Sequence, residues 1–96
     1  MITVISELDS VTSKQYDEVC RLANFSESNV PDGLVFHCAS PTDRGLVIVD
    51  VWENEDKFGK FRERLNPAIS QAGMTHKEPK IYRTYKTIQG KVLATR

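Results

Sequence analysis

The sequence predicts an α+β domain of the ferredoxin-like type, with a four-stranded antiparallel sheet and two helices on one face of the sheet. Three observations lead to this prediction. The elements expected along the 96 residues follow the order β-α-β-β-α-β. Two apolar, β-branched runs between Gly33 and Asn54 are separated by one short polar turn, which predicts a central hairpin. Both expected helices carry apolar residues at helical spacing, so each can cover the sheet with one face.

The first strand is predicted at Ile2–Glu7, which is rich in β-branched residues. The first helix is predicted to begin after Thr12, because threonine is a favourable N-cap and Gln15 three residues later completes a capping box. This helix is expected to end near Asn24, where a polar stretch follows. Its apolar stripe consists of Tyr16, Val19, Leu22 and Ala23.

The central hairpin is predicted from two strands, Leu34–Ala39 and Leu46–Glu53. The loop between them, Pro41–Gly45, contains the Pro, Asp and Gly residues that favour tight turns. The last strand is predicted at Lys80–Ile88, again from its β-branched and aromatic residues.

Asn54 is a good N-cap for the second helix, and the two acidic residues after it are favourable in a first turn. Because Pro67 cannot continue a helix without a kink, we expect a break at Asn66. A short helical turn over Ile69–Ala72 is expected to follow and to stop at Gly73. The buried stripe of the second helix consists of Phe58, Phe61 and Leu65.

The hairpin strands are apolar on both of their faces. A sheet that is covered on one side only should alternate apolar and polar residues along its strands. The segments Leu34–Phe36 and Leu46–Val49 do not alternate, so both faces of the hairpin need to be buried. The helices cover one face, and a second copy of the sheet is the simplest cover for the other. The sequence therefore predicts a homodimer in which two sheets form a shared α+β barrel.

The composition speaks against some classes of binding partner and favours one cellular location. The formal net charge is zero and no block of Lys and Arg occurs, which speaks against nucleic acid or an anionic membrane as a partner. No apolar stretch approaches the ~20 residues that span a bilayer, and the N-terminus lacks the features of a signal peptide, so we expect a cytoplasmic protein of one domain, residues 1–96. Cys20 and Cys38 lack metal-ligand spacing and are expected to be reduced; neither a metal nor a cofactor is predicted.

His37 and Asp50 are polar residues within the apolar strands, and they form the candidate catalytic pair. A buried histidine beside a carboxylate has its cationic form stabilised, which suits a general base. In an apolar pocket such a pair could take a proton from an activated phenol, a quinol or a carbon next to a carbonyl. The simpler alternative is that the two side chains only satisfy each other or nearby backbone groups. The residues predicted to bind the substrate are Trp52, Tyr85, Phe36 and Phe61.

The hairpin register decides whether these side chains meet, because residues alternate between the two faces of a strand. The favoured register places His37, Asp50 and Trp52 on one face, with His37 and Asp50 as diagonal neighbours. A slip of one residue would place His37 beside Val47 and Val49 instead. The facing pairs of the favoured register are Ala39 with Leu46, His37 with Ile48, and Val35 with Asp50.

The segment Pro31–Gly73 carries a wider pattern. It contains P-D-G-L-x-x-H-x-A, a short Pro/Gly loop, a strand ending in V-D-V-W-E, two phenylalanines three residues apart, R-L-x-P-A and a later glycine. This pattern resembles the dimeric α+β barrel superfamily and, within it, small proteins related to the antibiotic-biosynthesis-monooxygenase (ABM) domain. The resemblance implies a ferredoxin-like protomer, an obligate homodimer, and a pocket between sheet and helices. Members include cofactor-free oxygenases of polycyclic aromatics, haem-degrading enzymes, and isomerases or dehalogenating enzymes of small ring compounds.

The haem-degrading members are a poor match to this chain. They resemble it in having a strand tryptophan, here Trp52, but they also have an asparagine on the first strand and a ligand histidine on the second helix. Here the first strand offers Thr3 and Ser6, and His76 lies beyond Gly73, past the expected end of the helix. A haem-binding role is therefore not expected.

Two functions remain open. The first is a small cofactor-independent monooxygenase-like or isomerase-like enzyme, acting on an aromatic or cyclic small molecule, with His37 as the base and Asp50 orienting it. The alternative is a non-catalytic homodimeric module that binds a small apolar or aromatic ligand. A cavity of about 300 Å³ or more that His37 lines would favour the enzyme. A filled core with His37 hydrogen-bonded to backbone would favour the binding module.

Overall fold

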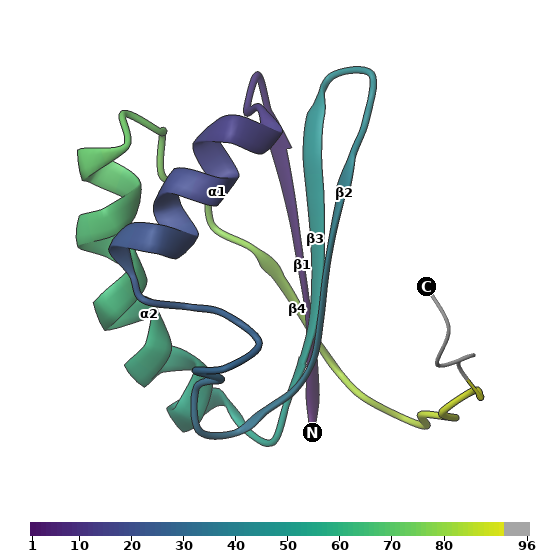
Figure 1. The fold of residues 1–96 in the computed structure, drawn as a ribbon. Coiled ribbons are helices and arrows are strands. Elements are labelled where there is room, and N and C mark those ends of the chain that lie inside the picture. Colours follow the sequence, from purple (N-terminus) through teal and green to yellow (C-terminus); the bar gives the residue numbers. More distant parts are fainter. Residues whose placement is uncertain (92–96) are drawn as a thin grey trace.

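Both helices pack on one face of a four-stranded antiparallel sheet in the computed structural model, which describes residues 1–91 (Figure 1). The strands lie side by side in the order β2-β3-β1-β4, so the first and third strands of the sequence form the centre of the sheet. The predicted ferredoxin-like α+β arrangement is confirmed. The elements are β1 (Ile2–Asp9), α1 (Ser13–Leu22), β2 (Leu34–Pro41), β3 (Gly45–Trp52), α2 (Glu55–Gln71) and β4 (Lys80–Arg83).

Helix α1 begins and ends with side-chain and backbone caps. The backbone N–H of Gln15 donates to Oγ1 of Thr12 at 3.1 Å, and the backbone N–H of Thr12 donates to Oε1 of Gln15 at 3.1 Å, which confirms the predicted capping box. The helix ends at Leu22, where Asn24 adopts the left-handed conformation (φ 53°). The N–H of Phe25 then bonds the carbonyl of Cys20 at 2.9 Å, closing a Schellman motif that turns the chain towards β2.

Helix α2 runs without interruption through Pro67, so the predicted break at Asn66 is wrong. Two features offset the cost of an internal proline. Pro67 and Glu63, whose carbonyl loses its usual N–H partner, are both exposed, so water can reach that carbonyl. The next residue, Ala68, is buried between the helices in a cluster with Val19 and Ala23. Tertiary packing therefore outweighs the local preference of the proline.

The C-terminal end of α2 follows the prediction more closely. The segment expected as a separate turn, Ile69–Ala72, forms the last turn and C-cap of the same helix. Gly73 has a φ of +76°, and the N–H of Met74 bonds the carbonyl of Ile69 at 3.0 Å. The helix thus stops where glycine can adopt a left-handed conformation.

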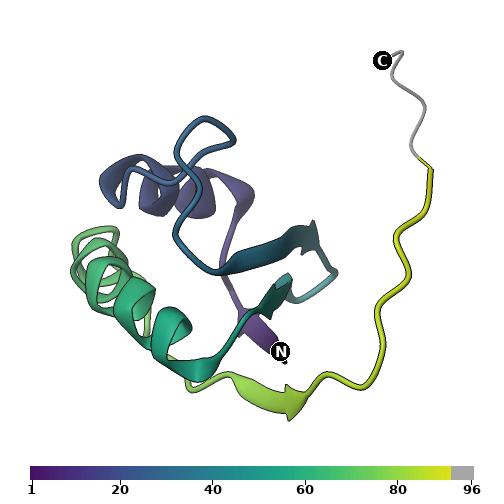
Figure 2. The same ribbon diagram turned by 90° about the horizontal axis from the view of Figure 1, so that it is seen from below.

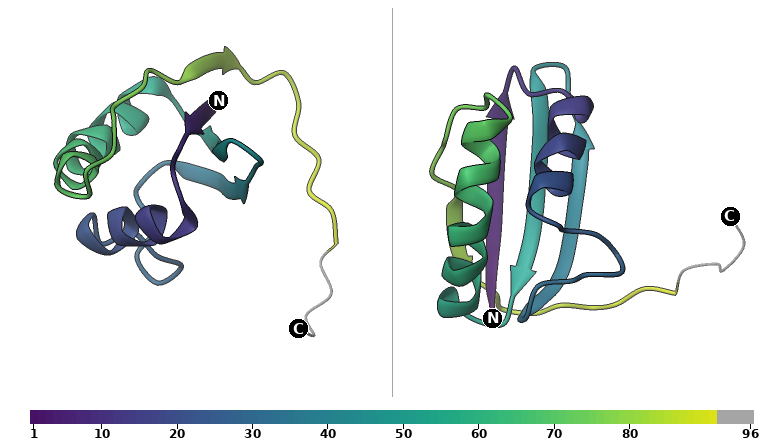
Figure 3. Two further views of the ribbon diagram at one scale, coloured as in Figure 1. Left: turned by 90° about the horizontal axis from the view of Figure 1, so that it is seen from above. Right: turned by 60° about the vertical axis from the view of Figure 1, so that its left-hand side comes forward.

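Strand β4 is shorter than predicted, because it ends at Arg83 instead of Ile88. It pairs only with β1, and that strand begins at Ile2, which lies opposite Arg83. One further backbone bond runs from the N–H of Thr84 to the carbonyl of Met1. Residues 84–91 then leave the sheet on the side opposite the helices, as the views from below and above show (Figures 2 and 3).

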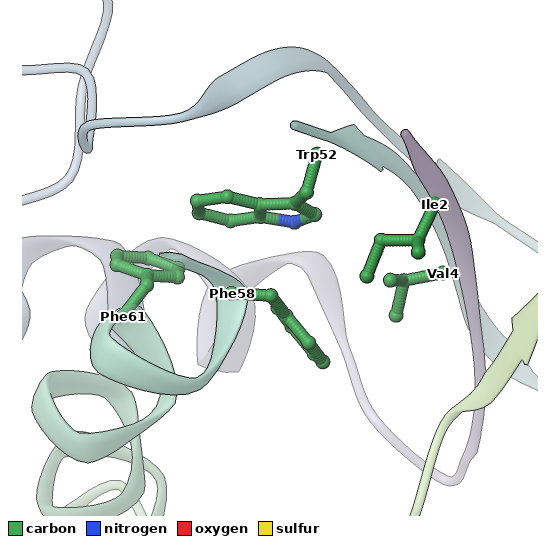
Figure 4. Close-up of a cluster of buried hydrophobic side chains, with 5 residues drawn as sticks. All are labelled: Ile2, Val4, Trp52, Phe58 and Phe61. Atoms are coloured by element: carbon green, nitrogen blue, oxygen red, sulfur yellow. The ribbon is translucent and has the colours of Figure 1, made fainter. Parts of the chain in front are cut away.

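The core lies between the sheet and α2. Trp52, at the end of β3, has no exposed surface, and its ring centroid lies 5.6 Å from that of Phe58 and 5.4 Å from that of Phe61. Ile2 and Val4 of β1 complete this cluster (Figure 4). The predicted stripe residues of α2 therefore pack against one large aromatic side chain from the sheet.

The other face of the sheet lies opposite the two helices and has an apolar centre, with polar residues such as Thr3, Glu7 and Lys80 around it. Phe36 and Tyr82 are 54% and 53% exposed on this face. Val47, Val49 and Val51 lie between them on β3, since they alternate with the helix-facing residues of that strand. The lack of alternation in the sequence is thus explained by a second apolar face. No helix within residues 1–91 combines the length and the apolar character needed to cross a bilayer.

Two glycines give a matched test of these packing arguments. A Cβ atom at Gly45 would clash with the backbone carbonyl oxygen of Leu8, whereas a Cβ at Gly59, within α2, would meet no atom within 4 Å. We expect Gly45→Ala to lower the free energy of unfolding by about 1–3 kcal/mol through overpacking. We expect Gly59→Ala to raise it by about 0.5–1 kcal/mol. Urea denaturation of both variants measures this, and a stabilised Gly45→Ala variant would contradict the packing of β1 against β3.

Candidate active site

His37 and Asp50 face each other directly across the hairpin. Nδ1 of His37 lies 2.6 Å from Oδ1 of Asp50, and the two residues form a facing pair on β2 and β3. The side chains are 19% and 10% exposed, so the pair is largely shielded from water but still reachable. The expected pairing of these two residues through side-chain contact is thus present in the structure.

The predicted register is wrong by two residues. Ala39 lies opposite Ile48, and Pro41 lies opposite Leu46, because the connecting loop is tighter than expected and is closed by a bond from the Thr42 N–H to the Gly45 carbonyl. A shift of two residues keeps every side chain on its face, so His37, Asp50 and Trp52 still lie together. At the other end of the hairpin, Val35 falls in a β-bulge and is exposed instead of facing Asp50.

Asp50 is buried, and both of its carboxyl oxygens have partners. Nε1 of Trp52 donates to Oδ2 at 3.1 Å, while Oδ1 faces His37. Burial of a carboxyl group is costly unless hydrogen bonds replace its water. Among residues 1–91 no buried side-chain nitrogen or oxygen is left without a hydrogen-bond partner. Trp52 therefore supports the site from the core.

Tyr16 joins the pair from α1. Its hydroxyl oxygen lies 2.6 Å from Nε2 of His37, so the histidine bridges a phenol and a carboxyl group. The ring of Phe25 meets the imidazole edge-on, with 4.8 Å between centroids, and helps to fix its orientation. The capping box after Thr12 fixes where α1 starts and so which of its residues face β2.

The sequence predicts Tyr16 only as part of the apolar stripe of the first helix, and not as a member of the site. A signal was present, because Tyr16 is the only hydroxyl-bearing residue in that stripe. A tyrosine hydroxyl that is buried usually finds a hydrogen-bond partner. Burial raises the pKa of Tyr16 above its ordinary value, with smaller contributions from Cys20 and Asp50. The phenol is therefore protonated at neutral pH.

A cavity of about 110 Å³ opens beside this cluster, between the sheet and the two helices. Tyr16, His37 and Asp50 line one part of it, and most of the remaining wall is apolar, including Phe61 and Leu65. Arg62, His76 and Lys77 also line the cavity. The volume is smaller than the 300 Å³ expected for an enzyme pocket. An engineered cavity of about 150 Å³ in another protein holds benzene, so the space here corresponds to a small ring or a part of a larger one.

The four residues predicted to bind substrate have different positions. Phe61 lines the cavity. Trp52 has no exposed surface, so it supports Asp50 instead of stacking on a ligand. Phe36 follows the alternation of β2 and lies on the opposite face of the sheet from His37. Tyr85 lies past the end of β4 and is 98% exposed. Within one chain, only Phe61 of the four reaches the cavity.

Residues that could hold a metal do not gather at this site. Within residues 1–91 no group of three or more His, Cys, Asp or Glu side chains has the arrangement of a metal site. Cys20 lines the cavity, whereas Cys38 is exposed on the other face of the sheet. Burial raises the pKa of the Cys20 thiol, so this group is a poor nucleophile at neutral pH.

Comparison with known proteins supports the architecture. No protein-family model matches the sequence, and no curated protein matches it. The crystal structure of SnoaB, a cofactor-independent oxygenase from Streptomyces nogalater, is similar to this chain with a TM-score of 0.58. The similarity covers 93% of this chain and 94% of SnoaB at 18% sequence identity. The chain therefore shares its fold with SnoaB, as the resemblance to ABM-related proteins implied.

The hydrogen bond between Trp52 and Asp50 can be tested with a double-mutant cycle. Trp52→Phe removes the indole N–H, and Asp50→Asn replaces one acceptor oxygen by a donor. We expect each change to lower the free energy of unfolding by about 1–3 kcal/mol or more. The coupling energy between the two changes should be about 0.5–3 kcal/mol. Tyr82→Phe, on the other face of the sheet, serves as the control partner and should be additive with Trp52→Phe. Additive effects of Trp52→Phe and Asp50→Asn in chemical denaturation would contradict the bond.

Proposed function

We propose that this protein is a small cofactor-independent enzyme of the monooxygenase-like or isomerase-like kind. It removes a proton from an aromatic or cyclic small molecule, with His37 as the proton acceptor and Asp50 as its orienting partner. One observation carries this proposal: the contact of 2.6 Å between His37 and Asp50 in the wall of an otherwise largely apolar cavity. The shared fold with SnoaB, a cofactor-independent oxygenase, supports it.

The pair fits the chemistry of a general base. Asp50 holds Nδ1 of His37 and stabilises the imidazolium that forms when the proton arrives. The substrate keeps the electron pair of the broken bond as a delocalised carbanion or phenolate. This anion can then react with dioxygen, as in a monooxygenation, or take the proton back at another position, as in an isomerisation. The apolar part of the wall and the low exposure of His37 and Asp50 limit the water around the pair, which strengthens their electrostatic interaction.

A second function is favoured by the size of the cavity. At about 110 Å³ it is smaller than typical ligand pockets, which suits a non-catalytic module that binds one small apolar or aromatic group. In that case the cluster around His37 gives stability and orientation without turnover. The two functions predict different effects of removing His37. Turnover falls if the protein is the enzyme, whereas only ligand binding can change if it is the binding module.

A homodimer belongs to this proposal under both functions. The face of the sheet opposite the helices presents apolar side chains, including the exposed Phe36 and Tyr82. Residues 84–91 extend on this same side, and Tyr85 and Ile88 are 98% and 83% exposed there (Figure 2). A second copy of the sheet would cover the face and give these residues apolar surface to contact. It would also close the α+β barrel.

The enzymatic role of His37 is tested by a ligand screen followed by turnover. We expect some small aromatic or cyclic compounds to raise the melting temperature of both the wild type and His37→Ala. Turnover of these compounds should fall about 10²–10⁴-fold in His37→Ala, because proton transfer loses its acceptor. Lys60→Ala, an exposed change on α2, serves as the control. Assays with and without dioxygen then separate oxygenation from isomerisation. Compounds that stabilise both proteins equally and are never turned over would favour the binding module.

The dimer is tested by placing a charge on the apolar face of the sheet. We expect the wild type to sediment as a dimer and Val49→Lys to shift it towards the monomer, because the ammonium group would be buried without a partner. Gln71→Lys adds the same charge on an exposed helix residue and should leave the dimer intact. Sedimentation equilibrium measures both. A wild-type protein that remains monomeric at micromolar concentration would contradict the proposed assembly.

A further inference from the structure

Both ring nitrogens of His37 are already engaged. Nδ1 contacts Asp50 and Nε2 contacts the hydroxyl of Tyr16, each at 2.6 Å. A substrate in the cavity therefore meets no free nitrogen of His37, although His37 lines the cavity wall. The group at the end of the chain of hydrogen bonds is the phenol of Tyr16, which lines the same cavity.

We propose that Tyr16 is the catalytic residue that exchanges a proton with the substrate. His37 then accepts the hydroxyl proton of Tyr16, and Asp50 stabilises the resulting imidazolium. This inference rests on the proposed proton-abstracting function and names a different residue as the point of contact. His37 then becomes a positioning and proton-holding residue, which acts on the substrate only through Tyr16.

The arrangement of hydrogens follows from the chemistry of the three groups. A carboxylate can only accept hydrogen bonds, so the hydrogen between His37 and Asp50 is on Nδ1. In a neutral imidazole Nε2 then has a lone pair and accepts the hydroxyl hydrogen of Tyr16. The Cys20 side chain also interacts with the Tyr16 hydroxyl, but a phenol oxygen has two lone pairs, so one can still accept a proton from the cavity. The resting site is thus arranged to receive a proton.

The proton moves in two linked transfers. The proton of the substrate passes to the oxygen of Tyr16 while the hydroxyl proton of Tyr16 passes to Nε2 of His37. The substrate keeps the bonding electron pair, His37 becomes an imidazolium, and Tyr16 is again a neutral phenol. The charge of the imidazolium is balanced by Asp50, which contacts Nδ1. Reversal of the two transfers returns a proton from Tyr16 to the substrate.

The two transfers need to be concerted. Burial raises the pKa of Tyr16, and the nearby Asp50 adds to this effect, so a free phenolate is disfavoured at this position. A concerted relay avoids the phenolate, because Tyr16 gains one proton as it loses another. The relay also gives and takes protons at one point of the cavity. It therefore suits substrates in which a single acidic group, such as a phenol or an activated carbon acid, lies beside Tyr16.

The experiment uses 4-nitrophenol as a probe, because its phenolate absorbs at a longer wavelength than the phenol. We expect the acid dissociation constant of the probe to rise about tenfold when it binds to the wild type, which equals one pKa unit. In Tyr16→Phe the probe should still bind, but its acid dissociation constant should return to that in free solution. Lys60→Ala, an exposed change on α2, should behave as the wild type.

Two results would overturn the role of Tyr16. If Tyr16→Phe ionises the bound probe as well as the wild type, and His37→Ala does not, then Tyr16 is dispensable for proton transfer and the proposed enzymatic function stands without the relay. If His37→Ala ionises the probe as well as the wild type, the proposed function fails too. Nitrogen-15 NMR of His37 in the ligand-free protein gives an independent result. A neutral ring with its hydrogen on Nδ1 and Nε2 as acceptor supports the relay, whereas a hydrogen on Nε2 of the neutral ring excludes it.

Discussion

Burial of the Asp50 carboxyl group is the constraint on which both the site and the core depend. Asp50 lies on the side of β3 that faces the helices. Its carboxyl group needs partners on both oxygens, since an unpaired buried charge costs several kcal/mol. His37 and Trp52 supply these partners from the facing strand and from two residues along the same strand. His37 in turn brings Tyr16 from α1. One buried acid thereby links three elements of the fold.

The sequence predicts most of the fold because apolar spacing and capping residues act locally. The capping box at Thr12 and the apolar strands require no knowledge of distant contacts. The predictions fail where distant contacts decide the outcome. Pro67 remains helical because Ala68 is buried against α1, and β4 ends early because β1 supplies no further partners. The role of Tyr16 depends on how α1 lies over β2, which no local pattern encodes.

The sequence predicts which polar residues form the candidate site and on which face they lie, but only part of their contacts. His37 and Asp50 stand out in the sequence as polar residues within apolar strands, and the alternation of side chains along a strand is enough to predict that they share one face. Their facing contact depends on the length of the hairpin loop, and an error of two residues leaves the face unchanged. Trp52 is an aromatic residue at a strand end, which suits a ligand wall or a core equally well. Its lack of any exposed surface selects the core.

The two faces of the sheet have different roles: one carries the candidate site, and the other is the surface of the proposed dimer. A domain of this size buries only roughly 60–65% of the surface that its unfolded form exposes, so little of its core can be given up to polar groups or empty space. The helix-facing side nevertheless contains a buried acid, a histidine and a cavity of about 110 Å³. The dimer proposed from the opposite face would add apolar burial without changing the cavity. Association of the sheets would then add stability to that of the core beneath the helices, and would offset the cost of keeping a polar cluster and a cavity there.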